Sequence, residues 1–396
     1  MDRRGDDPLL KDQSIMCLST MYWDFLWTRK QRFMNSLSRP EYGNKILYVE
    51  PTFSVKEKLL DPGVKNKGIA QIKKINENLS VLTPPLWVPF GRFEAIRKLN
   101  HRQSLRSIQK WQRNLGLQHP MLWTYRPDTA SLLGAFSEKF VVYDCVDEHS
   151  AYPGRDKRLV QQQEDVLVSR ADCVFVSARG LYERRKRLNP DTFFIPNGVD
   201  FPHLRKAQDP ATEIPEFLKS LKRPILGFVG GIADWIDLDL VRYIARARPD
   251  YSIVLVGPVT RHIDLKPFHS LPNVFFPGPK DRMEIPAYLK GFDVCLNIFK
   301  LNELSQTVNP LKVYEYLAAG RPVVSVNMPE IHHFKDIIWI ARDEEEFVDG
   351  IDRALKDPSP EKIQEGIRRV QEYSWDSLLN QVVEILNKIL KRKGKI

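Results

Sequence analysis

Short apolar runs rich in β-branched residues alternate with helical patterns along almost the whole chain. Such runs are typical of buried strands, and apolar positions three or four residues apart indicate amphipathic helices. In the first half of the chain the pattern predicts strands at 14–20, 45–49, 80–83, 121–124, 140–143, 171–176 and 192–195. In the second half it predicts strands at 224–229, 251–256, 274–276, 294–298, 322–326 and 337–340.

Strands that alternate with helices predict parallel sheets covered by helices on both faces. The second set of strands starts afresh near residue 222, after a polar, proline-containing stretch, and 396 residues exceed one ordinary core. We therefore expect an α/β protein with two Rossmann-like, doubly wound domains, at residues 1–200 and 201–374. An amphipathic helix is expected from Trp375 to Leu390.

The segment 309–325, NPLKVYEYLAAGRPVVS, predicts a polar loop, a short helix and a buried strand. Asn309 suits the N-cap and Pro310 the first helical position. A helix start binds anions through its free N–H groups and partial positive charge. Lys312 adds a cation and Glu315 a carboxylate, which together suit a nucleoside diphosphate sugar. The same spacing also suits an ordinary surface ion pair, and both interpretations stay open.

Glycine turns follow several strands of the second half, at Gly230-Gly231 and Gly278-Pro279. Ligands of open α/β sheets bind outside the carboxyl ends of the strands. We therefore expect these turns and the helix start at Asn309 to converge on one crevice. Neither a GxGxxG fingerprint nor a Walker A loop is present.

The net charge of +10 and pI near 9.3 favour an acidic partner. The segment 91–117 carries seven Lys/Arg against Glu94 alone, and its apolar residues recur at helical spacing after an apolar loop at 84–90. It predicts either a helix lying on an anionic membrane surface or a packed helix with a solvated basic face. Nucleic acid is not expected as a partner, because no supporting motif accompanies the charge.

The four cysteines are scattered and form no CxxC motif, so we expect neither disulfides nor a zinc site. No apolar run is long enough to span a membrane, and the charged first residues do not read as a secretory signal. These features predict a cytoplasmic protein with reduced thiols. Peripheral contact with the inner face of the cell membrane stays open.

Two segments carry a family resemblance: VFVSARGLYERRKR followed by IPNGVD (residues 174–200), and NPLKVYEYLAAGRPVV (309–324). They resemble the retaining, nucleotide-sugar-dependent glycosyltransferases of the two-Rossmann-domain (GT-B) type, family 4-like. Enzymes of cell-surface polysaccharide synthesis, including teichuronic acid glycosyltransferases, are the most similar. The resemblance implies two domains facing a cleft, with the last helix (375–396) packed back on the N-terminal domain.

The resemblance also implies roles for the predicted donor residues. Glu315 would receive the ribose hydroxyls of the donor. The diphosphate would be held by Asn309, Pro310, Leu311 and Lys312, beside Gly230 and Gly231, and the base by Gly278, Pro279 and Lys280.

This chain departs from the family pattern at two places. It lacks the Arg that the family often carries at the position of Gly231 and the Lys a few residues later. The position of a second glutamate, eight residues before Glu315, is Thr307. Lys312 would then replace the lost positive charge, and Glu303 or backbone groups would take over the sugar contact.

On the acceptor side, Asp147 lies at the carboxyl end of a predicted strand and would orient the attacking hydroxyl or accept its proton. A helix cap or a plain loop carboxylate is the alternative for Asp147. Trp27 and Arg29, together with Arg32, resemble the acceptor-facing turn of the same family.

These features predict a hexosyltransferase-type enzyme that moves a sugar from a nucleoside diphosphate sugar to a hydroxyl of a glycan or lipid-linked acceptor, with retention. The catalytic residues would be Asp147, Lys312 and Glu315. Because a helix dipole and Lys312 supply the positive charge, we expect no metal and no cofactor besides the donor. A non-catalytic nucleotide-sugar-binding protein and a nucleotide-sugar epimerase are the alternatives.

Overall fold

The structure is a computed structural model that describes residues 10–24, 27–52, 69–85, 93–152, 154–303 and 305–395. Most of the apolar loop expected at 84–90, and the first two residues of the basic segment, lie outside the described residues. The chain divides into two compact units, Met1–Ile195 with Leu379–Ile396, and Pro196–Leu378. The boundary predicted from the sequence lies at residue 200.

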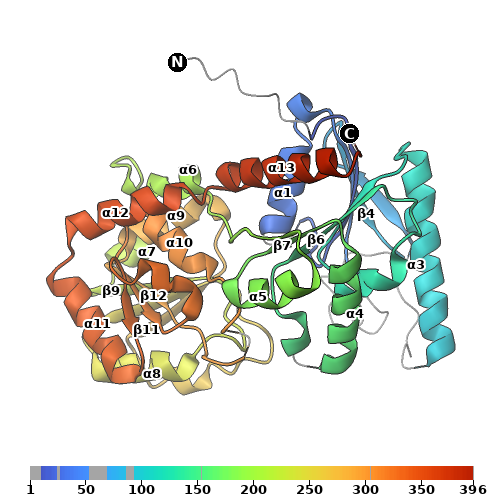
Figure 1. Ribbon diagram of the computed structural model, residues 1–396. Coiled ribbons are helices and arrows are strands. Elements are labelled where there is room, and N and C mark those ends of the chain that lie inside the picture. The colour runs from blue at the N-terminus through green and yellow to red at the C-terminus, as the bar shows by residue number, and fades with distance from the viewer. Residues whose placement is uncertain are drawn as a thin grey trace, which may run out of the picture. The chain divides into compact units, whose positions relative to one another are not determined.

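The N-terminal unit contains one eight-stranded sheet in the order β3-β4-β2-β1-β5-β6-β7-β8 (Figure 1). All neighbouring strands are parallel except the pair β3–β4. The strands are β1 (Ser14–Leu18), β2 (Lys45–Val49), β3 (Gln71–Lys74), β4 (Leu79–Thr83), β5 (Met121–Thr124), β6 (Phe140–Cys145), β7 (Cys173–Val176) and β8 (Thr192–Phe194). The order reverses between β1 and β5, which makes the carboxyl ends of these two strands a natural place for a ligand.

Helices and short 3₁₀ turns connect these strands. They are α1 (Arg29–Leu37), η1 (Pro40–Tyr42), α3 (Glu94–Asn114), η2 (Pro127–Leu132), η3 (His149–Ala151), α4 (Lys157–Arg170) and α5 (Arg179–Leu188). The C-terminal helix α13 (Trp375–Arg392) begins in the second unit and its residues from Leu379 onward belong to the first. Within the first unit, the ammonium of Lys393 lies 2.7 Å from the carboxylate of Asp172.

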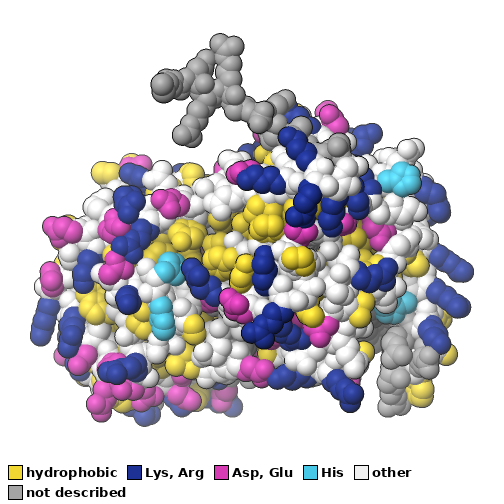
Figure 2. Space-filling view, in the orientation of Figure 1, with side chains coloured by type: hydrophobic (Ala, Val, Ile, Leu, Met, Phe, Trp, Pro, Cys, Tyr) yellow, Lys and Arg dark blue, Asp and Glu magenta, His cyan; other side chains and the backbone are white. Residues whose placement is uncertain are grey.

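The basic helix predicted from the sequence is α3. Its apolar side packs into the N-terminal core, where Ile108 is buried and Leu105 and Trp111 contact the same cluster. Its cations lie on the other side, and Lys and Arg side chains project where Figure 1 places α3 (Figure 2). At the start of the helix, Phe93 and Leu99 are each 53% exposed. The packed-helix interpretation therefore holds for the apolar face, and the cationic face is open to solvent.

The C-terminal unit contains a six-stranded, fully parallel sheet in the order β11-β10-β9-β12-β13-β14. Its strands are β9 (Ile225–Val229), β10 (Ser252–Val256), β11 (Val274–Gly278), β12 (Val294–Asn297), β13 (Val323–Val326) and β14 (Trp339–Ala341). The order reverses between β9 and β12, so the carboxyl ends of these two strands face the second natural ligand site.

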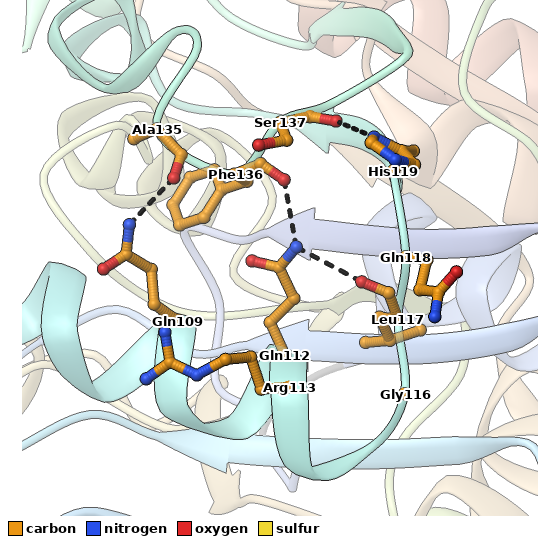
Figure 3. Close-up of a pocket in the computed structure, with 10 residues that line it drawn as sticks. All are labelled: Gln109, Gln112, Arg113, Gly116, Leu117, Gln118, His119, Ala135, Phe136 and Ser137. Carbon is orange, nitrogen blue, oxygen red and sulfur yellow. Dashed lines mark hydrogen bonds between the residues drawn. The ribbon is translucent and has the colours of Figure 1, made fainter.

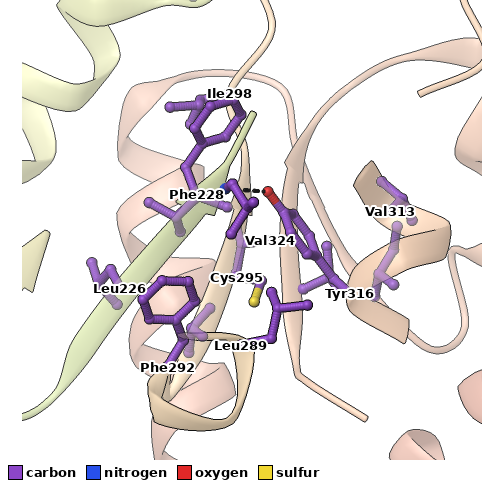
Figure 4. Packing of buried hydrophobic residues seen from close by; sticks show 14 of the residues in the cluster. Leu226, Phe228, Leu289, Phe292, Cys295, Ile298, Val313, Tyr316 and Val324 are labelled. Atoms are coloured by element: carbon purple, nitrogen blue, oxygen red, sulfur yellow. Dashed lines mark hydrogen bonds between the residues drawn. The ribbon is translucent and has the colours of Figure 1, made fainter. Parts of the chain in front are cut away.

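The helices of this unit lie before, between and after its strands. They are α6 (Phe201–Leu204), α7 (Glu216–Lys219), α8 (Leu238–Ala247), α9 (Ile285–Gly291), α10 (Leu311–Ala318), α11 (Glu344–Lys356) and α12 (Pro360–Gln371). Four 3₁₀ turns complete it: η4 (Arg205–Gln208), η5 (Lys266–Phe268), η6 (Arg282–Glu284) and η7 (Pro329–Phe334). One continuous cluster of buried side chains joins the sheet to the helices (Figure 4). Two parallel α/β units with reversed strand order confirm the predicted Rossmann-like architecture.

Candidate functional site

The most specific motif of the sequence forms the start of helix α10 in the C-terminal unit. The helix begins at Leu311, and Pro310 is its N-cap with φ −77° and ψ 97°. The predicted N-cap role of Asn309 is therefore wrong by one residue. The reason is that the Asn309 side chain is 3% exposed and is used elsewhere, because its amide donates to the Tyr314 hydroxyl at 3.0 Å.

Asn309 also joins the two segments that carry the family resemblance. The backbone N–H of Asn197 donates to Asn309 Oδ1 at 3.3 Å, and the Asn197 side-chain amide donates to the Asn309 carbonyl at 3.1 Å. Both residues belong to the C-terminal unit. The loop before α10 is thus held by the loop that opens this unit, which fixes where the helix begins.

Lys312 and Glu315 form an ion pair one turn into α10. The Lys312 ammonium lies 2.7 Å from Glu315 Oε2, and the two side chains are 24% and 22% exposed. The stem of Lys312 runs beside Gly230, since a Cβ built on that glycine would lie 3.1 Å from Lys312 Cε and 2.9 Å from the ring of Phe228. Lys312 therefore packs against the glycine turn after β9, and the pair is only partly exposed, unlike a pair of fully solvated side chains.

Helix α10 is fixed to the carboxyl end of β9 by a second contact. The N–H of Val229, the last residue of β9, donates to the Tyr316 hydroxyl at 3.0 Å. Figure 4 shows the Tyr316 ring extending from α10 toward this strand. Val313 and Tyr316 are fully buried, whereas the side chains of Lys312 and Glu315 on the same helix remain partly exposed.

The glycine turns after β9, β10 and β11 lie next to one another, as parallel strands require. Gly230 N–H donates to the Val256 carbonyl at 2.9 Å, and Gly257 N–H donates to the Gly278 carbonyl at 3.1 Å. Gly257 has a φ of 151°, and a Cβ there would lie 1.9 Å from the Gly230 carbonyl oxygen. Only a glycine at position 257 allows the turns after β9 and β10 to approach each other this closely.

The predicted base-binding turn lies at the end of β11. Gly278 has a φ of 76°, and a Cβ built on it would meet no atom within 4 Å. Pro279 is exposed, and the Lys280 ammonium lies 5.7 Å from the centroid of the Tyr288 ring. The structure thus brings Gly230, Gly231 and Lys312 together, with the Gly278 turn two strands away on the same edge.

In the N-terminal unit, Asp147 follows β6. It is half-buried, and its Oδ2 accepts a hydrogen bond from the Tyr152 hydroxyl at 2.9 Å. The cap of the next long helix, α4, is Asp156, whose carboxylate accepts from the Leu159 N–H. Asp147 is therefore a loop carboxylate at the carboxyl edge of the sheet, and its catalytic role stays a prediction.

The predicted acceptor residues Trp27 and Arg29 differ in their surroundings. Trp27 is half-buried, packs edge-on against Trp23 with ring centroids 5.5 Å apart, and has the Arg32 guanidinium 5.3 Å from its ring. Arg29 is 1% exposed; its Nε lies 2.9 Å from Asp144, and its Nη1 donates to the Ile195 carbonyl at 2.6 Å. Its side chain is turned into the core, so this burial does not support an acceptor contact for Arg29.

Sequence reasoning missed Lys30, the residue after Arg29. Its side chain is 7% exposed, with its ammonium 5.4 Å from the centroid of the Tyr125 ring. Burial lowers the pKa of Lys30, while the negative charges of Asp147 and Asp144 oppose that shift. The adjacent basic residues Arg29 and Lys30, in the first turn of α1, were a sequence signal for a cationic site. The sequence does not show which of the two side chains lies near the carboxylates of Asp144 and Asp147.

A buried ionic cluster lies directly after Asp147. Arg185, which is 1% exposed, donates through Nη2 to Glu164 at 2.7 Å and to Glu148 at 3.0 Å. The Tyr143 hydroxyl donates to the same Glu164 at 2.6 Å. Burial acts to lower the pKa of Arg185, but nearby groups, Glu164 and Glu148 among them, raise it overall. Arg185 in turn holds the pKa of Glu148 below its usual range against burial. The cluster anchors the loop in which Asp147 lies.

A polar hollow of about 420 Å³ lies elsewhere in the N-terminal unit, beside the last turns of α3 and the segment before β5 (Figure 3). Gln112 crosses it and donates to the carbonyls of Leu117 and Phe136. It lies at the amino end of the sheet, away from the carboxyl edge that carries Asp147. No predicted site residue lines it.

The described parts of the chain contain no cluster of three His, Cys, Asp or Glu side chains arranged to hold a metal ion. The expectation of a metal-independent reaction stays a prediction. The four cysteines are buried and free.

The chain is similar to known proteins in three comparisons: with protein families, with individual protein sequences and with solved structures. Residues 223–357 match the family described as glycosyl transferases group 1. The chain is 28% identical over 392 residues to TuaH of Bacillus subtilis (strain 168), which is provisionally named a teichuronic acid biosynthesis glycosyltransferase. That alignment covers 93% of this chain and 95% of TuaH.

The structure is also similar to solved structures at low sequence identity. Sucrose-phosphate synthase from Thermosynechococcus elongatus matches with a TM-score of 0.72 at 15% identity, covering 96% of this chain and 100% of that one. HepE from Anabaena, in complex with UDP, matches with a TM-score of 0.68 at 11% identity, covering 95% and 100%. A trehalose-6-phosphate enzyme from E. coli, bound with UDP-2-fluoro glucose, matches with a TM-score of 0.67 at 10% identity, covering 94% and 98%.

These comparisons confirm the predicted fold and enzyme class. The fold is GT-B, with two parallel-sheet α/β domains. The protein is a glycosyltransferase (EC 2.4). The matched residues 223–357 include Gly230, Gly231, Lys312 and Glu315.

Proposed function

We propose that this glycosyltransferase transfers a sugar, with retention, from a nucleoside diphosphate sugar to a hydroxyl of a glycan or lipid-linked acceptor in cell-surface polysaccharide synthesis. The observation that carries the proposal is the position of Lys312 at the start of α10, where its stem packs beside Gly230 and its ammonium pairs with Glu315. The teichuronic acid name of TuaH supports the polysaccharide role, and the family resemblance supports retention.

The start of α10 suits the diphosphate of the donor. Backbone N–H groups at the start of a helix carry partial positive charge, and Lys312 adds a full charge within the first turn. Both act most strongly when negative charge builds up on the departing diphosphate, so they lower the barrier as well as bind the donor. We propose on this ground that the reaction needs no metal ion, and activity that survives a chelator would support this.

Glu315 suits the hydroxyls of the donor ribose, because a carboxylate accepts two hydrogen bonds from neighbouring hydroxyls. Its pairing with Lys312 at 2.7 Å keeps the carboxylate in place before the donor binds. The open turn at Gly278–Lys280 is proposed to meet the base. Two of the similar structures hold UDP or a UDP sugar, so a uridine donor is the first to test.

In the N-terminal unit, Asp147 is proposed to orient the acceptor hydroxyl or accept its proton. The carboxylate is half-buried and already held by Tyr152, which limits its motion. Trp27 is proposed to contact the acceptor through its partly exposed ring.

Peripheral membrane contact, at the cytoplasmic face, is proposed through α3. The exposed side of this helix carries Lys98, Arg102, Arg106, Lys110 and Arg113, with Leu99 exposed among them. Cations beside apolar side chains favour anionic lipid headgroups. None of the described helices is long and apolar enough to cross a membrane.

The experiment is a comparison of UDP-, GDP- and dTDP-sugars, first by thermal shift and then by release of nucleoside diphosphate with candidate acceptors. A donor that raises the unfolding temperature and is consumed only with acceptor supports the proposal, and NMR of the product gives the anomeric configuration. This chain lacks the Arg at the position of Gly231 and the Lys a few residues later that related enzymes often carry. This lack favours one other candidate, a non-catalytic nucleotide-sugar-binding protein, which would bind a donor without turnover. Conversion of the donor sugar without acceptor would indicate an epimerase.

A further inference from the structure

The loop after β9 contains an exposed tryptophan that the core does not require. Trp235 is 45% exposed, although Ile232 and Ile236 on either side of it are 0% and 1% exposed. The two isoleucines anchor the loop, so the indole between them contributes little to the core. An exposed aromatic side chain alone is unremarkable, but one that lies beside a proposed ligand site suits the lining of that site.

The loop holds Trp235 in a fixed position. The Ile232 N–H donates to the Pro258 carbonyl at 2.9 Å, on the side of β10. On the side of β12, the Lys300 N–H donates to the Trp235 carbonyl at 2.8 Å, and Ile236 pairs with Phe299 in an antiparallel bridge. A side chain on a loop fixed from both sides loses little entropy when a ligand packs on it.

Trp235 lies next to the proposed diphosphate site. A Cβ built on Gly231 would lie 4.0 Å from Trp235 Cζ2, and one built on Gly230 would lie 3.1 Å from Lys312 Cε. Two glycines therefore separate the edge of the indole from the stem of the lysine. The indole and the lysine therefore lie beside adjacent residues of the same glycine turn.

The strand order gives the direction of the donor. In the order β11-β10-β9-β12, the Gly278 turn lies on one side of β9, and the backbone of Trp235 is bonded to the segment after β12 on the other. A donor with its base at Gly278 and its diphosphate at Gly230 would place its sugar on the Trp235 side. Within the described residues, no ring, cation or hydrogen bond engages the Trp235 indole, so its ring face and its Nε1–H are available.

We propose that Trp235 is the platform of the donor-sugar subsite, with the indole packed against the C–H face of the sugar ring. The proposal rests on the proposed function and adds the residue that recognises the sugar. A pyranose ring exposes C–H groups on its faces, which suit an aromatic surface. This chain has Thr307 where related enzymes often have a glutamate, so stacking on Trp235 would replace a carboxylate contact to sugar hydroxyls.

The test compares each nucleotide with its sugar form by calorimetry: UDP with UDP-glucose, GDP with GDP-mannose and dTDP with dTDP-glucose. The proteins are the wild type, Trp235→Ala and Trp235→Phe, with Met283→Ala as the control for loss of an exposed apolar side chain (64% exposed). We expect Trp235→Ala to weaken binding of the sugar nucleotide about tenfold and to leave the nucleotide affinity within about twofold. Trp235→Phe should keep most of the affinity, and Met283→Ala all of it.

If Trp235→Ala weakened the binding of the nucleotide and of the sugar nucleotide equally, the indole would contact the nucleotide, and the proposal would be wrong. Unchanged affinity for both would overturn it as well. Failure of the proposed function gives a different result, because then no nucleotide binds the wild type at all and Lys312→Ala changes nothing. Equal unfolding temperatures of the wild type and Trp235→Ala without ligand would show that the variant is folded.

Discussion

Asn197 and Asn309, 112 residues apart in the chain, are joined by two hydrogen bonds within the C-terminal unit, at 3.3 and 3.1 Å. The first uses the side-chain oxygen of Asn309 and the second its carbonyl. A third bond, from the Asn309 amide to the Tyr314 hydroxyl at 3.0 Å, ties the same residue to α10. The start of α10, the proposed diphosphate site, is thus held in place by the buried side chain and carbonyl of Asn309.

Asn309→Ala should therefore affect both stability and donor binding. It removes the acceptor of the Asn197 N–H and the amide that donates to the Tyr314 hydroxyl, and we expect a loss of about 1–3 kcal/mol in the free energy of unfolding. Urea unfolding gives this value, and calorimetry with the nucleotide gives the affinity. Asn114→Ala, at the exposed end of α3, is the control. Full stability and affinity in Asn309→Ala would contradict this account of the helix start.

Lys312→Ala should reduce turnover by about a hundredfold or more, as removal of single groups that stabilise developing charge does. The loss should appear mainly in kcat, because the charge on the diphosphate grows in the transition state. Glu315→Gln should mainly raise the KM for the donor, since the carboxylate contacts a part of the donor that does not react. Initial rates over a range of donor concentrations separate the two effects. The control is Lys335→Ala on the surface of the same unit, and wild-type kcat in Lys312→Ala would remove the lysine from the mechanism.

The hydrophobic pattern predicted every strand of both sheets except β3. That strand reads QIKK and lies at the edge of its sheet, where charged side chains are tolerated, so it has no apolar run to detect. The core strands were predictable because parallel strands buried on both faces need continuous apolar runs. The motif after Asn309 became α10, and its Lys312 lies beside the Gly230 turn that follows β9.

Side-chain directions were less predictable. The sequence places Arg29 and Lys30 in the same helical turn, but the ion pair of Arg29 with Asp144 depends on a residue 115 positions away. Asn309 looked like a helix cap because its contact with Asn197 cannot be seen in its own neighbourhood. Likewise, Arg185 lies in a basic run that suggests a solvated surface, and only the packing of α4 against α5 shows that it is buried.

Arg185→Met should strongly destabilise the N-terminal unit. Arg185 neutralises Glu164 and Glu148, and removal of one partner leaves buried charge, at a cost of about 3–5 kcal/mol. Guanidinium unfolding of the variant measures the loss, with Arg187→Met as the control because Arg187 is exposed on the same helix. The double variant Arg185→Met/Glu164→Gln should recover part of the stability. A loss no larger than that of the control would show that the cluster does not hold the loop of Asp147.

His149 should make the protein less stable in mild acid. Its Nε2 is enclosed without a hydrogen bond, and burial lowers the pKa of the ring below its usual 6.5. Asp147 and Glu164 oppose this shift, and Lys30 and Arg185 reinforce it. Because the folded pKa lies below the unfolded one, the unfolded state binds more protons between the two values. The contribution of uncharged His149 to the free energy of unfolding is therefore fully present above about pH 6.5. It decreases as the pH falls toward the folded pKa.

His149→Gln should remove this part of the pH dependence, since glutamine keeps a polar side chain but does not titrate. Unfolding free energies measured at intervals between pH 7.5 and about pH 5 should fall less steeply in the variant than in the wild type. His119→Gln, the same substitution at an exposed histidine of the same unit, is the control. Parallel slopes for the wild type and His149→Gln would mean that the ring is protonated as readily in the folded protein as in the unfolded chain. The enclosed nitrogen would then have access to water or to a carboxylate, and the loop of Asp147 would be looser than its contacts with Tyr152 and the Arg185 cluster require.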